Sequence, residues 1–151
     1  MSSLRQQALK LLARREHSRA ELAQKLSAAA PKEEIATVLD QLEQSGLLSD
    51  QRMAAAYLRS HAARFGLTKL RVNLRAKGIS AELIEQCLAE GADGAYEESE
   101  EERALQVYRR KFPQPPADQK QWAQQARFLQ ARGFSSGIIR KILNNVAEDE
   151  A

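Results

Sequence analysis

The chain has 151 residues, of which 43% are hydrophobic and 28% charged, and its formal net charge is +3. Seven glycines and four prolines are few for this length, and Ala, Leu, Gln, Arg and Glu are abundant, so the composition favours helices over strands. Arg5 and Lys10 interrupt the apolar pattern at the amino terminus, which excludes a signal-peptide core or membrane span there. We expect an all-α cytoplasmic protein with no membrane association.

Helical periodicity and chain breakers predict nine short helices. An amphipathic segment over residues 3–15 comes first, and Ser18 with Glu21 then forms a capping box for the second helix. Pro31 then opens a helix, and Gly46 and Ser49 separate that helix from the next one, over residues 50–64. Another helix starts at Gly66, and a helix over about 96–111 is ended by residues 112–116.

One pattern of apolar residues and glycine occurs twice and, more weakly, a third time. The spacing of Leu74, Gly78, Leu83 and Cys87 is repeated by Leu129, Gly133, Ile138 and Ile142, and again by Leu26, Ala30, Ile35 and Leu39. Each copy follows another amphipathic segment, so the unit is three helices. We expect three tandem three-helix repeats over residues 1–48, 49–90 and 91–151, stacked into an elongated array.

The turn inside each repeat has its own chemistry. Gly78 and Gly133 fit the left-handed position that ends a helix, and Ser80 and Ser135 fit the cap of the helix that follows. The segment 90–94 contains two glycines and is expected to be a hinge before the third repeat.

Charge alternates in blocks along the chain. Residues 51–81 carry seven basic side chains and no acidic one, residues 82–102 carry nine acidic and no basic ones, and residues 103–143 carry nine basic ones against Asp118 alone. The acidic run at 97–102 is typical of the positive end of a helix. Over residues 51–81 the absence of acid favours a surface that binds a polyphosphate backbone or an acidic protein groove.

The sequence lacks the patterns that carry catalysis. Neither a P-loop nor a dinucleotide-binding glycine motif is present. His17 and His61 are expected on the surface in different repeats, and the single cysteine, Cys87, is expected as a packed core thiol that excludes an internal disulfide. Trp122, Phe128 and Phe134 are expected to pack between repeats. We therefore predict that the chain is not an enzyme and uses no metal or cofactor.

Four segments together resemble the RecX family, bacterial regulatory proteins that modulate the RecA recombinase. They are ALKLLARREHSRAEL at 8–22, GLLSDQRMA at 46–54, GLTKLRVNLRAKGI at 66–79 and FLQARGFS at 128–135. Met53 departs from the usual aromatic residue, and AAAP ending at Pro31 replaces a Lys-Gly turn; both are packing or capping changes. The resemblance implies tandem three-helix repeats and a non-catalytic negative regulator that binds RecA filaments on DNA. It also implies inhibition of ATP hydrolysis, strand exchange and the filament-stimulated cleavage of the SOS repressor.

From the charge pattern we assign contacts with DNA phosphates or an acidic RecA surface to seven residues: Arg64, Lys69, Arg71, Arg75, Lys77, Arg127 and Arg132. The protein is expected to act as a monomer lying along the filament groove. Two alternatives stay open. One is a helix-turn-helix regulator that reads duplex DNA through residues 67–88 or 118–143, although the second helices there begin apolar or acidic. The other is a helical scaffold that binds proteins without nucleic acid.

Overall fold

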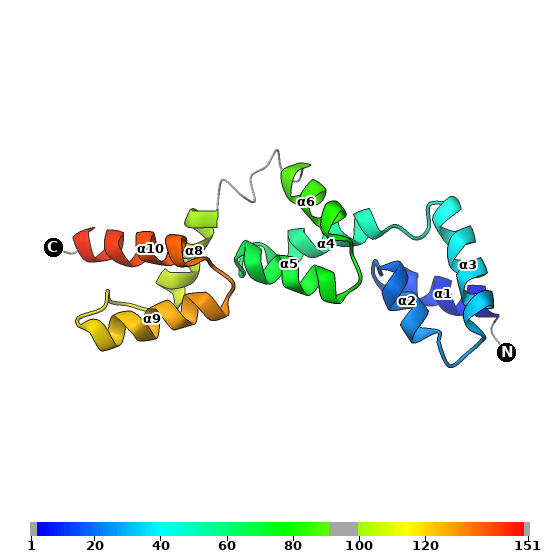
Figure 1. Cartoon of the computed structure of the whole chain (residues 1–151), viewed down its shortest axis with the longest axis horizontal. Helices are drawn as coiled ribbons and strands as arrows, with labels where there is room; N and C mark the ends of the chain where they lie inside the picture. Colours follow the sequence, from blue (N-terminus) through cyan, green and yellow to red (C-terminus); the bar gives the residue numbers. More distant parts are fainter. Residues whose placement is uncertain (1–2, 91–99, 150–151) are drawn as a thin grey trace. The chain divides into compact units, whose positions relative to one another are not determined.

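The computed structural model describes residues 3–90 and 100–149, which form nine helices and no strand (Figure 1). The first repeat contains α1 (Leu4–Arg14), α2 (Arg19–Lys25) and α3 (Lys32–Gln44). The second contains α4 (Asp50–His61), α5 (Leu67–Ala76) and α6 (Ala81–Glu90), and the third contains α8 (Glu100–Lys111), α9 (Gln119–Ala131) and α10 (Ser136–Asp149). The predicted all-α tandem helical repeat is therefore confirmed.

The chain divides into two compact units whose boundary falls within the second repeat. Unit 1 contains the described residues up to Tyr57 together with Leu74–Cys87. Unit 2 contains Leu58–Asn73 and the described residues from Leu88 onward. Each unit therefore joins one terminal repeat to a part of the second repeat.

Local capping explains where several of these helices begin. The Ser18 hydroxyl accepts from the Glu21 amide at 3.0 Å, and the Glu21 carboxylate accepts from the Ser18 amide at 3.0 Å, which confirms the capping box. Ser80 and Ser135 cap α6 and α10 by accepting from the third amide beyond each of them, at 3.2 and 3.3 Å. The sequence alone thus determined these helix starts.

The turns of the second and third repeats have the same hydrogen-bond pattern. Gly78 and Gly133 have φ of 85° and 92°, and the amide after each donates to the carbonyl five residues back. The corresponding turn of the first repeat is longer and contains no glycine, and α3 begins directly after Pro31. This difference explains why the first copy of the sequence pattern is weak.

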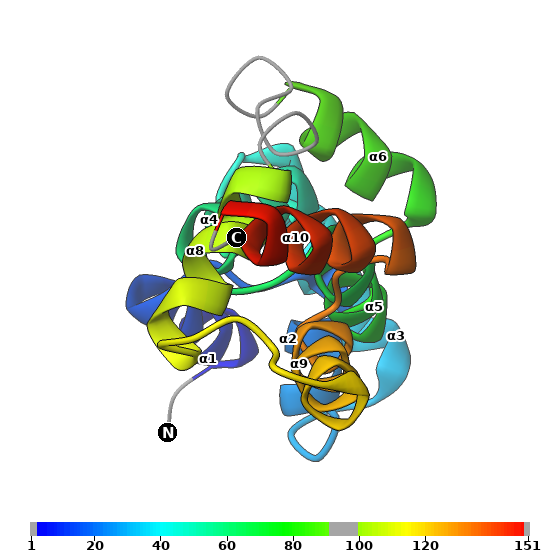
Figure 2. The same cartoon turned by 90° about the vertical axis from the view of Figure 1, so that its left-hand side faces the viewer.

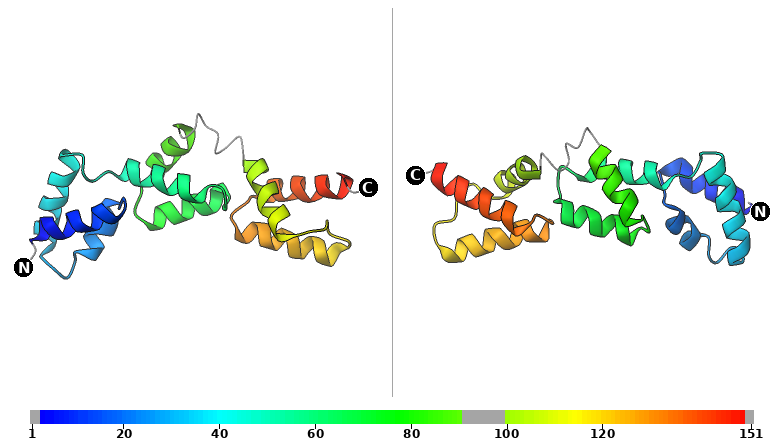
Figure 3. Two further views of the ribbon diagram at one scale, coloured as in Figure 1. Left: turned by 180° about the vertical axis from the view of Figure 1, so that it is seen from behind. Right: turned by 45° about the horizontal axis from the view of Figure 1, so that its top comes forward.

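Each terminal repeat has its own apolar core. In the first repeat α1 and α2 lie against α3, and a cluster that includes Ala8, Leu22 and Leu39 is almost completely buried (Figures 1 and 3). In the third repeat α8 and α9 both contact α10, around a buried cluster that includes Leu129 and Leu143 (Figure 2). Burial of these side chains provides the main stabilisation of each repeat.

Burial corrects three predictions about single side chains. His17 is 1% exposed and therefore not a surface residue, and His61 is half-buried, with its ring stacked on Phe65. Phe134 belongs to the third repeat's own core, against which Trp122 and Phe128 pack, so these rings do not serve mainly to join repeats. The prediction for Cys87 is correct, because its thiol is buried.

Two predictions fall partly outside the described residues. Of the expected hinge at 90–94, only Glu90 is among the described residues. The part of the acidic run before Glu100 also lies outside them. Glu100, Glu101 and Glu102 do occupy the first turn of α8, where their charge interacts favourably with the helix dipole.

Candidate basic binding surface

Five of the seven predicted basic residues lie in unit 2, and three of them are brought together around one aromatic ring. The Lys69 ammonium lies 4.8 Å from the centre of the Phe65 ring, and the guanidinium carbons of Arg132 and Arg64 lie 5.8 and 5.9 Å from it. We call Arg64, Phe65, Lys69 and Arg132 the Phe65 cluster. Cations attract the electron-rich face of an aromatic ring, so Phe65 partly offsets their mutual repulsion.

The Phe65 cluster is positioned by the contact between the second and third repeats within unit 2. The Gly66 amide donates to the Arg132 carbonyl at 2.8 Å, and the Lys69 ammonium donates to the Ala131 carbonyl at 3.3 Å. The first amide of α5, at Leu67, donates to the Glu100 carboxylate of α8 at 3.0 Å. The backbone of the turn after α9 therefore lies directly against the start of α5.

The basic surface continues from Arg132 onto the third repeat. The Arg132 guanidinium also lies 5.2 Å from the centre of the Phe128 ring, and the Lys111 ammonium lies 5.7 Å from that same ring. Sequence reasoning missed Phe65 and Lys111 and assigned Phe128 to packing alone. The available signal was the pair Arg64-Phe65 placed directly before a helix start, but pairing it with Arg132 required the fold.

The other predicted residues are placed differently. Arg71 is half-buried on α5, and Arg127 is exposed on α9. Arg75 and Lys77 belong to unit 1. There Arg75 is exposed and donates to the Ile79 carbonyl at 3.2 Å, while the Lys77 ammonium lies 3.9 Å from the Glu21 carboxylate.

Glu21 pairs with both Arg15 and Lys77 in a network of ion pairs in unit 1. Burial raises the pKa of Glu21, but hydrogen bonds from the Arg15 guanidinium and the Ser18 amide outweigh it and hold this pKa below its ordinary value. The charge of Lys77 contributes in the same direction. Lys77 thus has a carboxylate partner at 3.9 Å.

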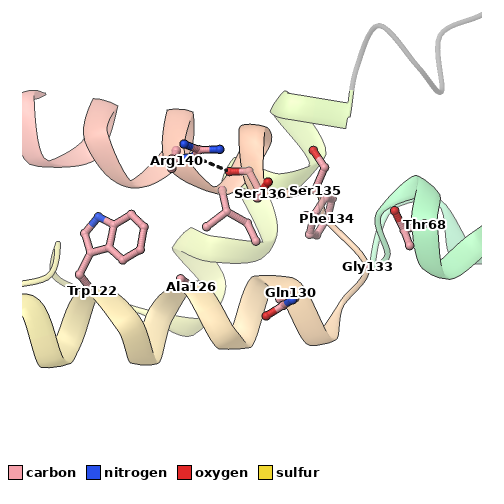
Figure 4. Close-up of a pocket in the computed structure, with 10 residues that line it drawn as sticks. Thr68, Trp122, Ala126, Gln130, Gly133, Phe134, Ser135, Ser136 and Arg140 are labelled. Carbon is pink, nitrogen blue, oxygen red and sulfur yellow. Dashed lines mark hydrogen bonds between the residues drawn. The ribbon is translucent and has the colours of Figure 1, made fainter.

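A cavity of about 440 Å³ lies beside the turn after α9. Figure 4 shows Trp122 and Ala126 on one side and Phe134 and Ser136 on the other, with Thr68 of α5 at its edge. Arg140 also lines it and donates to the Ser136 carbonyl at 3.4 Å. Apolar and hydroxyl-bearing side chains dominate this lining, and it carries no nucleophile paired with a base.

No group of three or more His, Cys, Asp or Glu side chains in residues 3–90 and 100–149 is placed to hold a metal ion. Over the same ranges, no helix combines the length and apolar character that crossing a bilayer requires.

Comparison with known proteins identifies the family. Models of the first, second and third three-helix domains of RecX match residues 5–42, 49–88 and 98–143. The chain belongs to the RecX family. A regulatory protein RecX from Leptothrix cholodnii is 46% identical over 142 residues, covering 93% of this chain and 87% of that one. Another, from Herbaspirillum seropedicae, is 44% identical over 149 residues, covering 98% and 94%.

Solved structures of RecX proteins share the fold. The crystal structure of RecX from Lactobacillus salivarius superposes with a TM-score of 0.78 at 20% identity, over 95% of this chain and 94% of that one. At this low identity the likeness concerns the arrangement of helices. The family is one of regulatory proteins, in agreement with the resemblance carried by the four sequence segments.

Proposed function

We propose that this RecX-family protein is a negative regulator of RecA that binds RecA–DNA filaments, acting by occupancy and without catalysis. The observation that carries the proposal is the Phe65 cluster: three cations gathered on one ring, in a chain whose relatives are named regulatory protein RecX. Concentrated positive charge attracts a phosphate backbone and increases the rate of encounter with it.

The proposed mechanism is that a cytoplasmic monomer lies along the filament groove and spans neighbouring RecA protomers. Bound there, it would restrain the motions that accompany ATP hydrolysis and block access of a second DNA strand or of the SOS repressor. The seven predicted basic residues supply the contacts, and α5 is central among them because it carries Lys69, Arg71 and Arg75 on one helix. Val72, which is 60% exposed between the two arginines, adds an apolar contact for a protein partner.

The test is ATP hydrolysis by RecA on single-stranded DNA while this protein is titrated in, with binding to bare DNA followed at the same salt. The parent should inhibit below one molecule per RecA protomer, at concentrations that leave bare DNA free. The double variant Arg71→Glu, Arg75→Glu should lose this inhibition. The matched control is Arg5→Glu, Lys10→Glu on α1, which makes the same charge change at two exposed positions.

Circular dichroism should show that both double variants melt near the parent, so that a loss of inhibition reports contact and not unfolding. Full inhibition by the α5 double variant would contradict the assignment to α5. A parent that never inhibits RecA would contradict the proposed function itself.

One observation favours a second candidate, direct regulation through duplex DNA. The exposed side chains of α10 include Arg140 and Asn144, one helical turn apart, and these are residue types that read base edges. This candidate predicts tight, sequence-dependent binding to duplex DNA with no effect on RecA. Substituting both residues by Ala would then remove the sequence preference, while the filament proposal predicts unchanged ATPase inhibition.

A further inference from the structure

The contact between neighbouring repeats occurs twice in this chain with a similar pattern of hydrogen bonds. Within unit 1, the Arg19 amide at the start of α2 donates to the Asp50 carboxylate of α4 at 2.8 Å. Within unit 2, the Leu67 amide at the start of α5 donates to the Glu100 carboxylate of α8 at 3.0 Å. We call these contacts the first junction and the second junction.

The turn of the following repeat closes each junction. In the first, the Ser18 hydroxyl donates to the Lys77 carbonyl, and a Cβ on Gly78 would lie 2.3 Å from the Cβ of Ala20. In the second, the Gly66 amide donates to the Arg132 carbonyl, and a Cβ on Gly133 would lie 2.3 Å from the Cβ of Lys69. Glycine is required at both turns because a Cβ there would collide with the neighbouring helix, at the Cβ of Ala20 in the first junction and at the Cβ and backbone of Lys69 in the second.

Equivalent positions around the two junctions carry opposite charge. Two residues before the helix cap stands Glu16 in the first junction and Arg64 in the second, and the third residue of the helix is Glu21 or Lys69. The turn residue before the glycine is basic in both junctions, Lys77 or Arg132. The second junction thus has bases at the two positions where the first has acids, and both junctions have a base at the turn position.

In the first junction, ion pairs offset the charges of the acids and bases. Glu16 accepts from the Arg52 guanidinium at 2.9 Å, and Glu21 accepts from the Arg15 guanidinium at 2.9 Å and lies 3.9 Å from the Lys77 ammonium. Each acid therefore has a basic partner, and the packed turn can be held without any ligand.

The second junction is not balanced in this way. Among residues 3–90 and 100–149, no carboxylate lies within ion-pair distance of Arg64, Lys69 or Arg132. Glu100 belongs to the same junction, but its carboxylate accepts the Leu67 amide. Like charges held around a single ring repel each other, and a polarised ring offsets this repulsion only in part.

We propose that the second junction is a polyphosphate site, in which the backbone of a single nucleic-acid strand takes the place that Glu16 and Glu21 hold in the first. Two arginines and a lysine lie within 5.9 Å of the centre of one ring. A guanidinium fork matches phosphate geometry, so a densely charged phosphate chain fits better than scattered carboxylates. The bound strand then strengthens the contact between the second and third repeats. The inference deepens the proposed function and rests on it for the identity of the partner.

The coupling can be measured by amide hydrogen exchange on the full chain with and without oligothymidylate. The Gly66 and Leu67 amides donate across the second junction, so their exchange should slow when the oligonucleotide binds. The Arg19 amide donates across the first junction and serves as an internal control that should not change. Equal slowing of all three amides, or no slowing at Gly66 and Leu67 despite binding, would overturn the proposal.

A charge graft tests the same site by substitution. Arg64→Glu, Lys69→Glu gives the second junction the acids of the first and should weaken oligothymidylate binding by roughly tenfold or more at low salt. The control Arg5→Glu, Lys10→Glu has the same net charge and should bind nearly as the parent does. The variant Lys69→Gln keeps a donor for the Ala131 carbonyl, so it should fold even if the graft does not. Its binding to oligothymidylate should be weakened about threefold or more.

Two further outcomes separate this inference from the proposed function. If polyglutamate slows the exchange of these amides as much as oligothymidylate does, the partner is an acidic protein and the phosphate assignment is overturned. If the oligonucleotide results are as expected but RecA is not inhibited, the site stands and the regulatory proposal fails. If RecA is inhibited equally by the parent and the graft, the regulatory proposal stands and this site is not its DNA contact.

Discussion

At the scale of single residues, His17 shows how a polar side chain is accommodated in a helical repeat. It is 1% exposed, with Nδ1 3.0 Å from the Arg15 carbonyl and Nε2 3.1 Å from the Lys25 ammonium. These partners require Nδ1 to donate and Nε2 to accept, which is the neutral imidazole. Burial lowers the pKa of His17 and outweighs the opposing effect of the Arg15 carbonyl.

The free energy of unfolding should therefore fall as the pH falls below 6.5, the ordinary pKa of histidine. The unfolded chain binds the proton there while the folded chain does not, so stability is complete above pH 6.5 and declines towards the lowered folded pKa. Urea denaturation of the parent and of His17→Asn between pH 7.5 and 5 measures this. The variant should lack this part of the pH dependence; identical profiles would contradict the interpretation.

At the scale of elements, two glycines with left-handed backbone separate the conformational cost of a turn from the cost of its packing. Gly46 and Gly133 both have positive φ, 78° and 92°. A Cβ on Gly46 meets no atom within 4 Å, whereas a Cβ on Gly133 would lie 2.6 Å from the Lys69 amide nitrogen. The first position requires only left-handed backbone, and the second also requires the space.

Gly46→Ala should therefore reduce the free energy of unfolding by about 1–2 kcal/mol, the cost of left-handed backbone for a residue with a Cβ. Gly133→Ala should cost at least about twice as much, because the backbone of α5 must also move. Chemical denaturation of the two variants beside the parent makes the comparison. Equal losses would show that the second junction yields without cost.

At the scale of the whole molecule, the separation of charge along the chain determines how binding responds to salt. Nucleic-acid affinity falls with salt because bound cations release counterions from the phosphates, by about 0.7 in the slope of log K for each contact with a single strand. The segment 82–102 is acidic and the segments on either side of it are basic, so the net charge of the chain understates how strongly salt affects binding.

Arg71→Gln, Arg75→Gln should reduce the magnitude of this slope by about 1.4 if both arginines contact phosphates. Arg5→Gln, Lys10→Gln removes the same charge from α1 and should leave the slope unchanged. Fluorescence titrations of labelled oligothymidylate at several salt concentrations give both slopes. Parallel decreases in the two variants would mean that binding depends on net charge and not on α5.

Much of the architecture was predictable because its determinants are local. The capping box at Ser18, the glycine turns at Gly78 and Gly133 and the apolar spacing around Leu74 are contained within a few residues each, and local geometry decides them. The segments resembling RecX, now supported by three family-domain matches, added the family.

The sequence by itself determined the helices, the repeat and the presence of excess basic charge, because propensity, capping and composition act over short distances. Tertiary structure decided which charges matter together. Arg64 and Arg132 are 68 positions apart, yet both lie against Phe65, while Lys77 lies 3.9 Å from the Glu21 carboxylate. The folded chain brings distant residues within a few ångströms, the range over which charges interact strongly, and no property of one segment reveals that pairing.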